Sequence, residues 1–272
     1  MFKDEKTGIL YRKWGDSPSK ISVILIHGMG AHSERWAFMG NFFAGNGMTS
    51  YALALKGFGE TDGVKGHIDS FETYYKDILT LRNIIINDNP GSKVVLLGES
   101  MGGLISFVCV CQNPELFDAL ICLVPAFKSR MKLSFFEYLK LFVFLLVKPH
   151  GQIKMSFSGK MCTRDIKYEK AMEKDPREHR YASAKLLWEI LKIQIATDKK
   201  KYDINKPVLF MSAGADKLVD SALTEKVFND LSSENKKLIM YPDMYHALSI
   251  ELGKEKVFED ILNWIKTSYS LS

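Results

Sequence analysis

The chain has 272 residues, of which 46% are hydrophobic and 25% charged, and its net charge is +5. These ordinary globular values exclude a disordered chain, and the length suits one large α/β domain or a core with an inserted subdomain. Four of the first six residues are charged, and the most apolar stretch, 133–147, has 15 residues. That is fewer than the roughly 20 residues that span a bilayer. We therefore expect neither a secretory signal nor a transmembrane helix, and a cytoplasmic protein with at most peripheral membrane contact.

Short apolar runs alternate with longer helical patterns along most of the chain. Runs that are almost continuously apolar are typical of parallel strands covered on both faces. The predicted strands are residues 8–14, 21–27, 49–55, 93–98, 119–124, 207–212 and 236–241. The predicted helices are residues 35–45, 71–88, 101–112, 221–231 and 254–269. This alternation predicts an α/β fold with a doubly wound, mostly parallel central sheet flanked by helices.

The alternation stops between residues 126 and 206, where we expect helices and no strand. The helical segments predicted there are 134–147, 165–173 and 181–196. We interpret residues 126–206 as a helical cap inserted into a core made of residues 1–125 and 207–272. The insert begins after the C-terminal end of a strand, which is the edge where α/β sheets bind ligands. It carries 19 Lys and Arg against 9 Asp and Glu, a net charge of +10, so all the positive excess of the chain lies there.

Residues 98–102 read GESMG and join a predicted strand to a predicted helix. Small residues at both ends of this stretch allow a sharp strand-to-helix turn that exposes Ser100 at its tip. Such a motif also arises by chance in about one chain in ten or twenty of this length, and a serine before a helix can be a simple N-cap. Ser100 is a candidate nucleophile only if a base and an acid accompany it.

A serine nucleophile requires a histidine base and a carboxylate that orients the histidine. On this kind of sheet the acid and then the histidine are expected downstream of the serine, each after a late strand. Asp216 and His246 lie just after the last two predicted strands, at the same edge of the sheet as Ser100. Asp220 is an alternative acid but lies farther from its strand end. No other histidine follows a strand downstream of Ser100.

The sequence HGMG at residues 27–30 follows the first predicted parallel strand. A loop of small residues at this place can aim backbone N–H groups at an oxyanion. We predict that the amides of Met29 and Met101 form such an oxyanion hole, Met101 being the residue after the nucleophile. His27 is expected to hold the loop rather than to transfer protons.

With these segments in place, the chain resembles the α/β-hydrolase superfamily, and most of all its monoacylglycerol lipase and lysophospholipase branch. The matching segments are ILIHGMGAHSERW, YALALKGFGETDG, FETYYKDI, LLGESMGG, SAGADKLVD and YHALSIE, in the order and spacing of that branch. The resemblance covers about residues 9–268 and is weakest in the insert. It implies the α/β-hydrolase fold, with Ser100 as nucleophile, Asp216 as acid and His246 as base. It also implies that the insert covers an acyl-binding pocket.

Two positions depart from the pattern of this branch. Relatives usually read Asp-x-Arg-Gly-His-Gly-x-Ser where residues 54–61 read ALKGFGET. That loop supports the site without performing chemistry, so the departure does not affect the predicted triad. Val219 stands where some lipases of the branch carry a reactive cysteine, so we expect no sensitivity to thiol reagents at this position.

The apolar stretch of the insert has two interpretations. Residues 133–147 read LSFFEYLKLFVFLLV, and residues 128–164 hold eight basic groups and one acid. The helix could simply be buried against the core. Alternatively, apolar side chains ringed by Lys and Arg suit an anionic lipid surface and a mouth that admits acyl chains. In the second interpretation Phe135, Phe142 and Phe144 contact the substrate.

These patterns together predict a serine hydrolase that cleaves carboxylic esters of single-chain lipids through an acyl-enzyme. Monoacylglycerol is the first candidate substrate, and the alternatives are a lysophospholipase, a broader carboxylesterase or a peptidase of the same fold. A non-catalytic lipid-binding homologue is disfavoured because all three triad positions are filled. We expect no metal, since the four cysteines lack metal-binding spacing, no organic cofactor, and no nucleic-acid partner. Acyl-chain length, leaving group and oligomeric state do not follow from the sequence.

Overall fold

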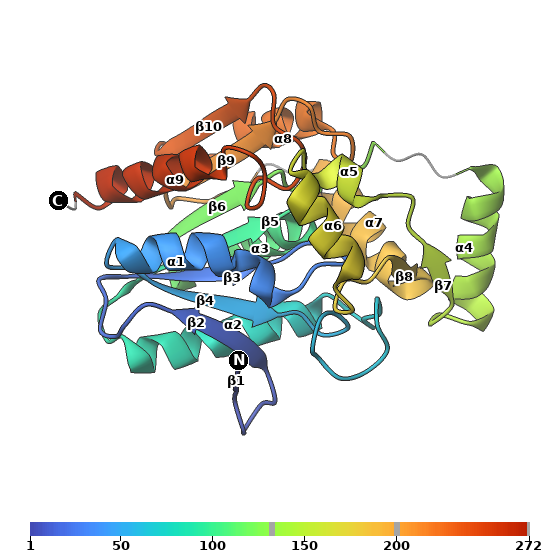
Figure 1. The fold of residues 1–272 in the computed structure, drawn as a ribbon, viewed down its shortest axis with the longest axis horizontal. Coiled ribbons are helices and arrows are strands. Elements are labelled where there is room, and N and C mark those ends of the chain that lie inside the picture. The colour runs from blue at the N-terminus through green and yellow to red at the C-terminus, as the bar shows by residue number, and fades with distance from the viewer. Residues whose placement is uncertain (131–133, 199–201, 271–272) are drawn as a thin grey trace.

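The computed structural model describes residues 1–130, 134–198 and 202–270 (Figure 1). Its centre is an eight-stranded sheet with the strand order β1-β2-β4-β3-β5-β6-β9-β10. The strands are β1 (Phe2–Lys3), β2 (Leu10–Trp14), β3 (Ile21–Ile26), β4 (Thr49–Ala54), β5 (Lys93–Glu99), β6 (Ala119–Leu123), β9 (Val208–Ala213) and β10 (Lys236–Tyr241). β1 pairs antiparallel with β2, and β2 pairs antiparallel with β4. The other neighbouring strands pair parallel. The predicted mostly parallel sheet is confirmed.

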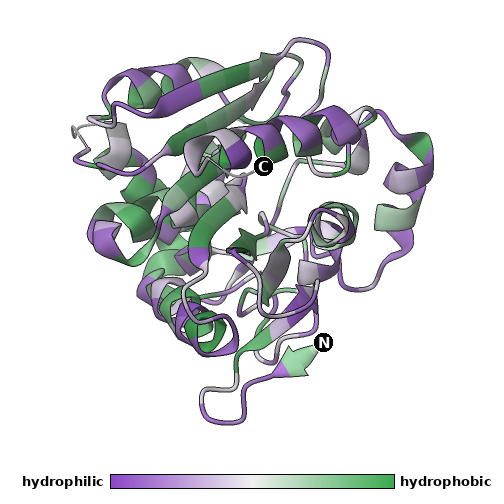
Figure 2. Ribbon diagram, turned by 90° about the vertical axis from the view of Figure 1, so that its left-hand side faces the viewer, coloured by the Kyte–Doolittle hydropathy of each residue, from purple (hydrophilic) through white to green (hydrophobic). Residues whose placement is uncertain are grey.

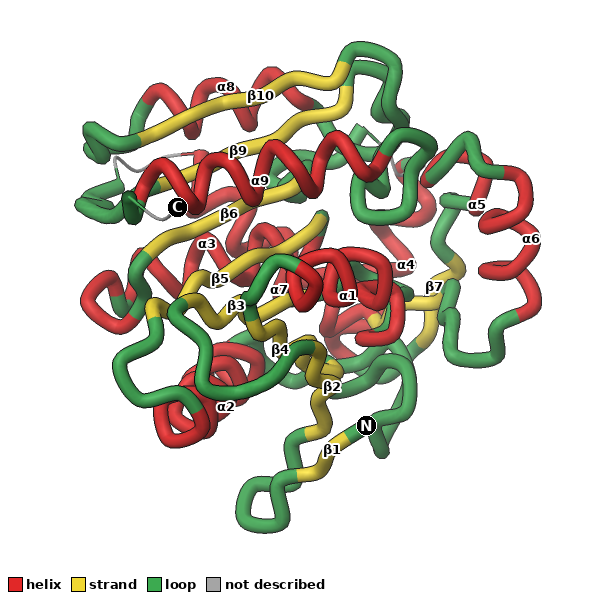
Figure 3. Tube along the Cα trace, turned by 60° about the vertical axis from the view of Figure 1, so that its left-hand side comes forward, coloured by secondary structure: helices red, strands yellow, loops and turns green. Residues whose placement is uncertain are grey.

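Helices cover both faces of this sheet because its central strands are apolar on both sides. On β3, Val23 and Leu25 belong to one buried cluster, whereas Ile24 and Ile26 belong to the other. The helices of the core are α1 (Ala37–Gly45), α2 (Glu72–Asp88), α3 (Met101–Gln112), α8 (Ser221–Asn229) and α9 (Lys254–Ser268). Residues of α1 and α9 pack in the cluster of Val23, and residues of α2, α3 and α8 in the other. Figure 3 shows α1 and α9 crossing the near face of the sheet.

Hydropathy follows this layering. In Figure 2 the central strands are hydrophobic along their length, whereas the outer helices show hydrophobic and hydrophilic stripes. The stripe of α9 that faces the sheet contains Val257, Phe258, Ile261 and Ile265, at helical spacing. Continuous apolar runs therefore correspond to strands buried on both sides, and striped segments to helices with one face in water.

Residues 126–206 lie between β6 and β9 and extend beyond the carboxyl ends of the strands (Figure 1). Their elements are α4 (Phe135–Val147), β7 (Gln152–Lys154), α5 (Gly159–Cys162), α6 (Ile166–Lys174), β8 (Tyr181–Ser183) and α7 (Ala184–Asp198). Helix α4 stands at the outer rim, farthest from the sheet in Figure 1. None of the described helices combines the length and the apolarity needed to cross a membrane.

The prediction that this insert contains no strand was wrong. β7 and β8 form a two-stranded antiparallel sheet, and the helix expected from residue 181 begins at Ala184. Ser183 ends the strand and starts the helix, because its hydroxyl accepts the Leu186 amide at 3.0 Å. Each strand has only three residues, which is too short for a period-two pattern to be read. Their pairing comes from tertiary structure.

Candidate active site

Ser100 lies at the tip of a sharp turn between β5 and α3. Its backbone has φ 59° and ψ −120°, a region that residues with a side chain rarely adopt. The turn requires glycine on both sides, since a Cβ at Gly98 would overlap the Gly102 carbonyl and a Cβ at Gly102 would overlap the Ile26 carbonyl. The small residues of GESMG thus let α3 start directly against β3 and β5. This close approach presents the Ser100 side chain at the carboxyl edge of the sheet.

Three side chains from separate strand ends form one hydrogen-bonded chain. His246 Nε2 lies 2.9 Å from Ser100 Oγ, and His246 Nδ1 lies 2.8 Å from Asp216 Oδ2. The other carboxylate oxygen of Asp216 accepts the amides of Leu218 and Val219 at 2.7 and 3.0 Å. Burial opposes ionisation, but His246 and these two amides together lower the pKa of Asp216. An ionised Asp216 accepts the Nδ1 proton and leaves Nε2 to accept from Ser100.

The structure also separates the two candidate acids. Asp220, the alternative, accepts the Ala222 amide at 3.2 Å and so caps the N-terminus of α8. Its other oxygen pairs with Lys128 at 3.2 Å. Asp216 therefore contacts the histidine, and Asp220 performs a capping role.

The HGMG loop runs directly beside Ser100. A Cβ added to Gly28 would lie 3.1 Å from the Ser100 Cβ, so only glycine leaves this approach unhindered. Met29 and Met101 both line the cavity in front of Ser100. Met101 opens α3, and its amide therefore has no partner within the helix. The arrangement brings the predicted donors and the serine to one place.

His27 holds this loop through both ring nitrogens. Its Nδ1 donates to the Gly28 carbonyl at 2.9 Å, and its Nε2 accepts the Leu55 amide at 3.1 Å. Accepting an amide requires the neutral imidazole, and burial lowers the pKa of His27 to about 3. His27 thus links the loop after β3 to the end of β4 and has no contact with the Ser100 hydroxyl that would suit proton transfer.

This buried imidazole predicts a loss of stability in acid. An unfolded His27 takes up its proton near pH 6.5, whereas the folded one does so near pH 3. Between these values the unfolded state binds more protons, so the free energy of unfolding rises with pH. We expect the free energy of unfolding, measured by urea titration, to be flat above pH 7 and to fall below pH 6.5, by up to about 1.4 kcal/mol per pH unit for this residue.

The matched variant is His27→Asn, whose side chain offers a donor and an acceptor but gains no proton. Its unfolding free energy is expected to fall less steeply between pH 6.5 and 4 than that of the wild type. His32, whose pKa burial lowers to about 4, accounts for part of the remaining slope. Equal slopes for the two proteins would show that His27 is not the group responsible.

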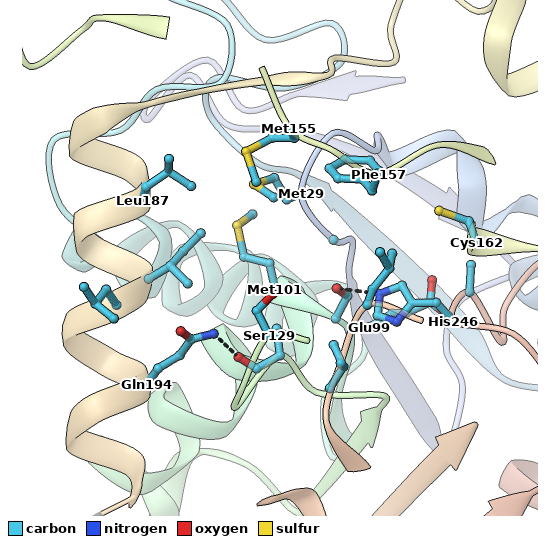
Figure 4. Close-up of a pocket in the computed structure, with 18 of the residues that line it drawn as sticks. Met29, Glu99, Met101, Ser129, Met155, Phe157, Cys162, Leu187, Gln194 and His246 are labelled. Carbon is cyan, nitrogen blue, oxygen red and sulfur yellow. Dashed lines mark hydrogen bonds between the residues drawn. The ribbon is translucent and has the colours of Figure 1, made fainter. Parts of the chain in front are cut away.

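Ser100 and His246 open into a cavity of about 210 Å³ between the sheet edge and the insert (Figure 4). Its lining is mainly apolar, with Met29, Met101, Met155, Leu187, Ile190, Leu191, Leu218 and Val219 among its residues. Besides Ser100 and His246, the polar lining residues include Arg35, Glu99, Ser129 and Gln194. The Gln194 amide, on α7, donates to the Ala126 carbonyl at 2.8 Å. The cavity therefore suits a hydrocarbon chain leading to a reactive serine.

Helix α4 contributes to this cavity differently from the prediction. Tyr138 and Leu141 are its lining residues, whereas Phe142 and Phe144 are not among the described residues that line it. Phe142 points outward and is 59% exposed, and Phe144 packs beside Leu141 in a small cluster under the helix. The side chain of Phe135 lies outside the described residues. Because apolar residues occupy nearly all faces of α4, the sequence did not indicate which face turns inward.

Two buried acidic groups that the sequence analysis did not single out connect the insert to the core. Glu178 of the insert accepts Nε and one terminal nitrogen of Arg35 at 2.7 and 2.6 Å, and Arg35 lines the cavity. Glu251, fully buried, accepts the amides of Tyr245 and Arg164, each at 3.0 Å. The insert is thus bonded to the short 3-10 helix Ser33–Trp36 that follows β3 and to the loop that carries the histidine.

A main-chain contact adds to this second connection. The amide of Ala247, the residue after His246, donates to the Cys162 carbonyl of the insert at 2.8 Å. Glu251 lies within the YHALSIE segment. The sequence does not indicate, however, which distant amides a carboxylate on a loop will bind.

Fold and site geometry place the chain among the α/β-hydrolases. The profile of the family described as serine aminopeptidase, S33 (Hydrolase_4) matches residues 17–253. The chain therefore belongs to this family, and it is a hydrolase.

Curated and solved relatives are similar over nearly the whole chain. A monoacylglycerol lipase of Mycolicibacterium smegmatis is 25% identical, with 94% of this chain and 92% of that protein covered. Phospholipase YtpA of Bacillus subtilis is 29% identical, with 87% and 92% covered. The crystal structure of a Paleococcus ferrophilus monoacylglycerol lipase superposes with a TM-score of 0.86 at 24% identity, covering 96% of this chain and 99% of that one.

Proposed function

We propose that the chain hydrolyses carboxylic esters of single-chain lipids, with monoacylglycerol as the preferred substrate. The observation that carries this proposal is the Asp216–His246–Ser100 chain of hydrogen bonds opening into an apolar cavity. At about 210 Å³ this cavity is smaller than the roughly 300–1,000 Å³ usual for small-molecule sites, which favours one acyl chain over two. The similarity to the lipase of Mycolicibacterium smegmatis supports a glycerol ester.

In the proposed reaction His246 takes the Ser100 proton as the serine oxygen attacks the ester carbonyl, and Asp216 stabilises the resulting imidazolium. The carbonyl oxygen becomes negative and is held by the amides of Met29 and Met101. The carbon–oxygen bond to the alcohol then breaks, and the alcohol leaves with the proton from His246. Water, deprotonated by the same imidazole, attacks the acyl-serine and releases the fatty acid.

A substrate series tests this proposal and its alternatives. We expect turnover to be highest with a monoacylglycerol, lower with lysophosphatidylcholine and absent with an aminoacyl p-nitroanilide. The second arm is included because of the similarity to phospholipase YtpA, and the third because of the family description. Glu99 is the acidic side chain among the described lining residues, and both of its carboxylate oxygens accept from Ser249, which leaves a charged α-amino group little to bind. A kcat/KM higher for lysophosphatidylcholine or for the anilide than for monoacylglycerol would contradict the proposed substrate.

Within this proposal, residues 126–206 act as a cap on a core made of residues 1–125 and 207–272, and the cap docks on anionic lipid. Away from the cavity, α4 exposes large apolar side chains: Phe136, Leu139, Phe142, Val143, Leu146 and Val147. Lys140 and Lys148 are exposed on the same helix and at its end. Apolar groups beside cations, in an insert of net charge +10, complement a negatively charged headgroup layer.

We expect the double variant Phe142→Ser/Leu146→Ser to lose most of its binding to vesicles that contain phosphatidylserine. These two side chains are 59% and 69% exposed, so their replacement should leave the fold intact. Sedimentation with anionic and neutral vesicles is the measurement, and Met240→Ser, an exposed apolar residue on β10 at 46%, is the matched control. Equal binding of the wild type to both vesicle types would remove the electrostatic part of the proposal.

A further inference from the structure

We propose that Glu99 is a positioning residue for His246, one that braces the histidine loop and supplies a second negative charge to the imidazole when it is protonated. This inference rests on the proposed role of His246 as the base. Glu99 is the residue directly before Ser100 in GESMG. The reaction proposed above gives Glu99 no role.

The brace consists of two hydrogen bonds to one residue. Glu99 Oε1 accepts the Ser249 amide at 2.9 Å, and Glu99 Oε2 accepts the Ser249 hydroxyl at 2.8 Å. Ser249 follows His246 by three residues, and the Leu248 amide between them donates to the His246 carbonyl at 3.2 Å. The loop that carries the imidazole is therefore fixed to the last residue of β5, and Ser100 is the next residue along the chain.

The Glu99 carboxyl group is held by hydrogen bonds rather than by an ion pair. Arg35 lines the same cavity, but Glu178 takes its guanidinium in a two-point ion pair. Within the part of the chain that the structure describes, no Lys or Arg forms an ion pair with Glu99. Glu99 and His246 both line the cavity (Figure 4). Glu99 is thus a second buried carboxyl group close to the site, besides Asp216.

Burial makes this charge depend on its surroundings. Glu99 is 6% exposed, and its pKa lies above the ordinary value, because burial outweighs the two hydrogen bonds from Ser249 and the positive charges of His246 and Arg35, which lower it. Attraction between buried opposite charges is only weakly screened. The anion at Glu99 is therefore favoured most when His246 has taken the serine proton. It stabilises that state without touching the reacting atoms.

Two variants separate the effect of the Glu99 charge from the effect of its hydrogen bonds with Ser249. Glu99→Gln keeps the shape and removes the charge, so kcat for p-nitrophenyl butyrate should fall about tenfold with KM little changed. The acid limb of the kcat/KM profile should move by about 0.5–1 pH unit to lower pH, because imidazolium loses a favourable neighbour. Ser249→Ala removes one bond and keeps the charge, so kcat should fall while the acid limb stays in place.

Control variants define the outcome that overturns the inference. Glu189→Gln alters a glutamate of α7 that is 3% exposed and pairs with Lys185 and Lys192, and it should leave the pH profile unchanged. Glu99→Asp retains the charge and should keep the wild-type midpoint. An acid limb of Glu99→Gln that coincides with that of the wild type would assign Glu99 a purely structural role and overturn the inference.

A measurement without turnover keeps this inference distinct from the proposed function. The His246 imidazole can be titrated by NMR in the Ser100→Ala background, with and without Glu99→Gln. A midpoint lowered by Glu99→Gln supports the inference even if the wild type cleaves none of the lipid esters. An unmoved midpoint in an enzyme that cleaves them as proposed overturns the inference and leaves the function standing.

Discussion

Replacing Ser100 by glycine is expected to abolish ester hydrolysis and at the same time to raise the melting temperature. Loss of the nucleophile should lower kcat by at least about 10⁴-fold. The wild-type serine sits at φ 59°, ψ −120°, a conformation that costs about 1–3 kcal/mol. Glycine adopts it without steric strain, at an entropic cost of about 0.5–1 kcal/mol. A net gain of about 1 kcal/mol corresponds to a rise of about 2–4 °C for a chain of this size.

Ser100→Ala is the matched variant, since it removes the same hydroxyl but keeps the Cβ. It should be as inactive as Ser100→Gly without the gain in melting temperature. Hydrolysis of p-nitrophenyl butyrate and differential scanning calorimetry provide the two readouts. Wild-type turnover in either variant would exclude Ser100 as the nucleophile, and a lower melting temperature for glycine than for alanine would contradict the strain argument.

The core of the fold could be predicted because its signals are local. The run ISVILI is buried at every position in β3, and a strand covered on both faces is one of the few structures that such a run fits. The apolar residues of α9 recur at helical spacing, which is an equally clear local signal. In the insert, by contrast, β7 and β8 depend on each other across about thirty residues, and no pattern within either segment indicates its partner.

The site residues also divide into those that the sequence predicts and those whose contacts depend on tertiary structure. Ser100, Asp216 and His246 could be anticipated because the carboxyl ends of parallel strands meet at one edge, so topology brings them together. The inward face of α4 could not be anticipated, since periodicity is uninformative in a helix that is apolar all round. The hydrogen bonds of Glu99 and Glu251 could not be anticipated either, because they depend on how separate segments of the chain approach each other.

Glu99 and Glu251 both hold the loop that carries His246 in place. Glu99 fixes the histidine loop to the strand of the nucleophile, and Glu251 fixes the same loop to the insert. The position of the imidazole therefore depends on both the sheet and the seating of the insert. Changes in the insert that leave the cavity lining intact can still alter the distance between His246 and Ser100.

Asp216→Asn is expected to lower kcat by about 10³–10⁴-fold, whereas Asp220→Asn stays within about twofold of the wild type. An asparagine amide can donate to His246 Nδ1, which places the ring proton on Nε2 and leaves no acceptor for the Ser100 hydroxyl. At position 220 asparagine still caps α8, and the exposed pair with Lys128 contributes little.

The two asparagine variants together test the choice of acid that geometry makes, because the residues lie four positions apart in one loop. The measurement is kcat for p-nitrophenyl butyrate at pH 8, with circular dichroism as a check on folding. An Asp216→Asn variant that keeps more than a tenth of wild-type kcat would show that His246 does not depend on this carboxylate. Equal damage by both variants would point to a disturbed loop, because only Asp216 contacts the histidine.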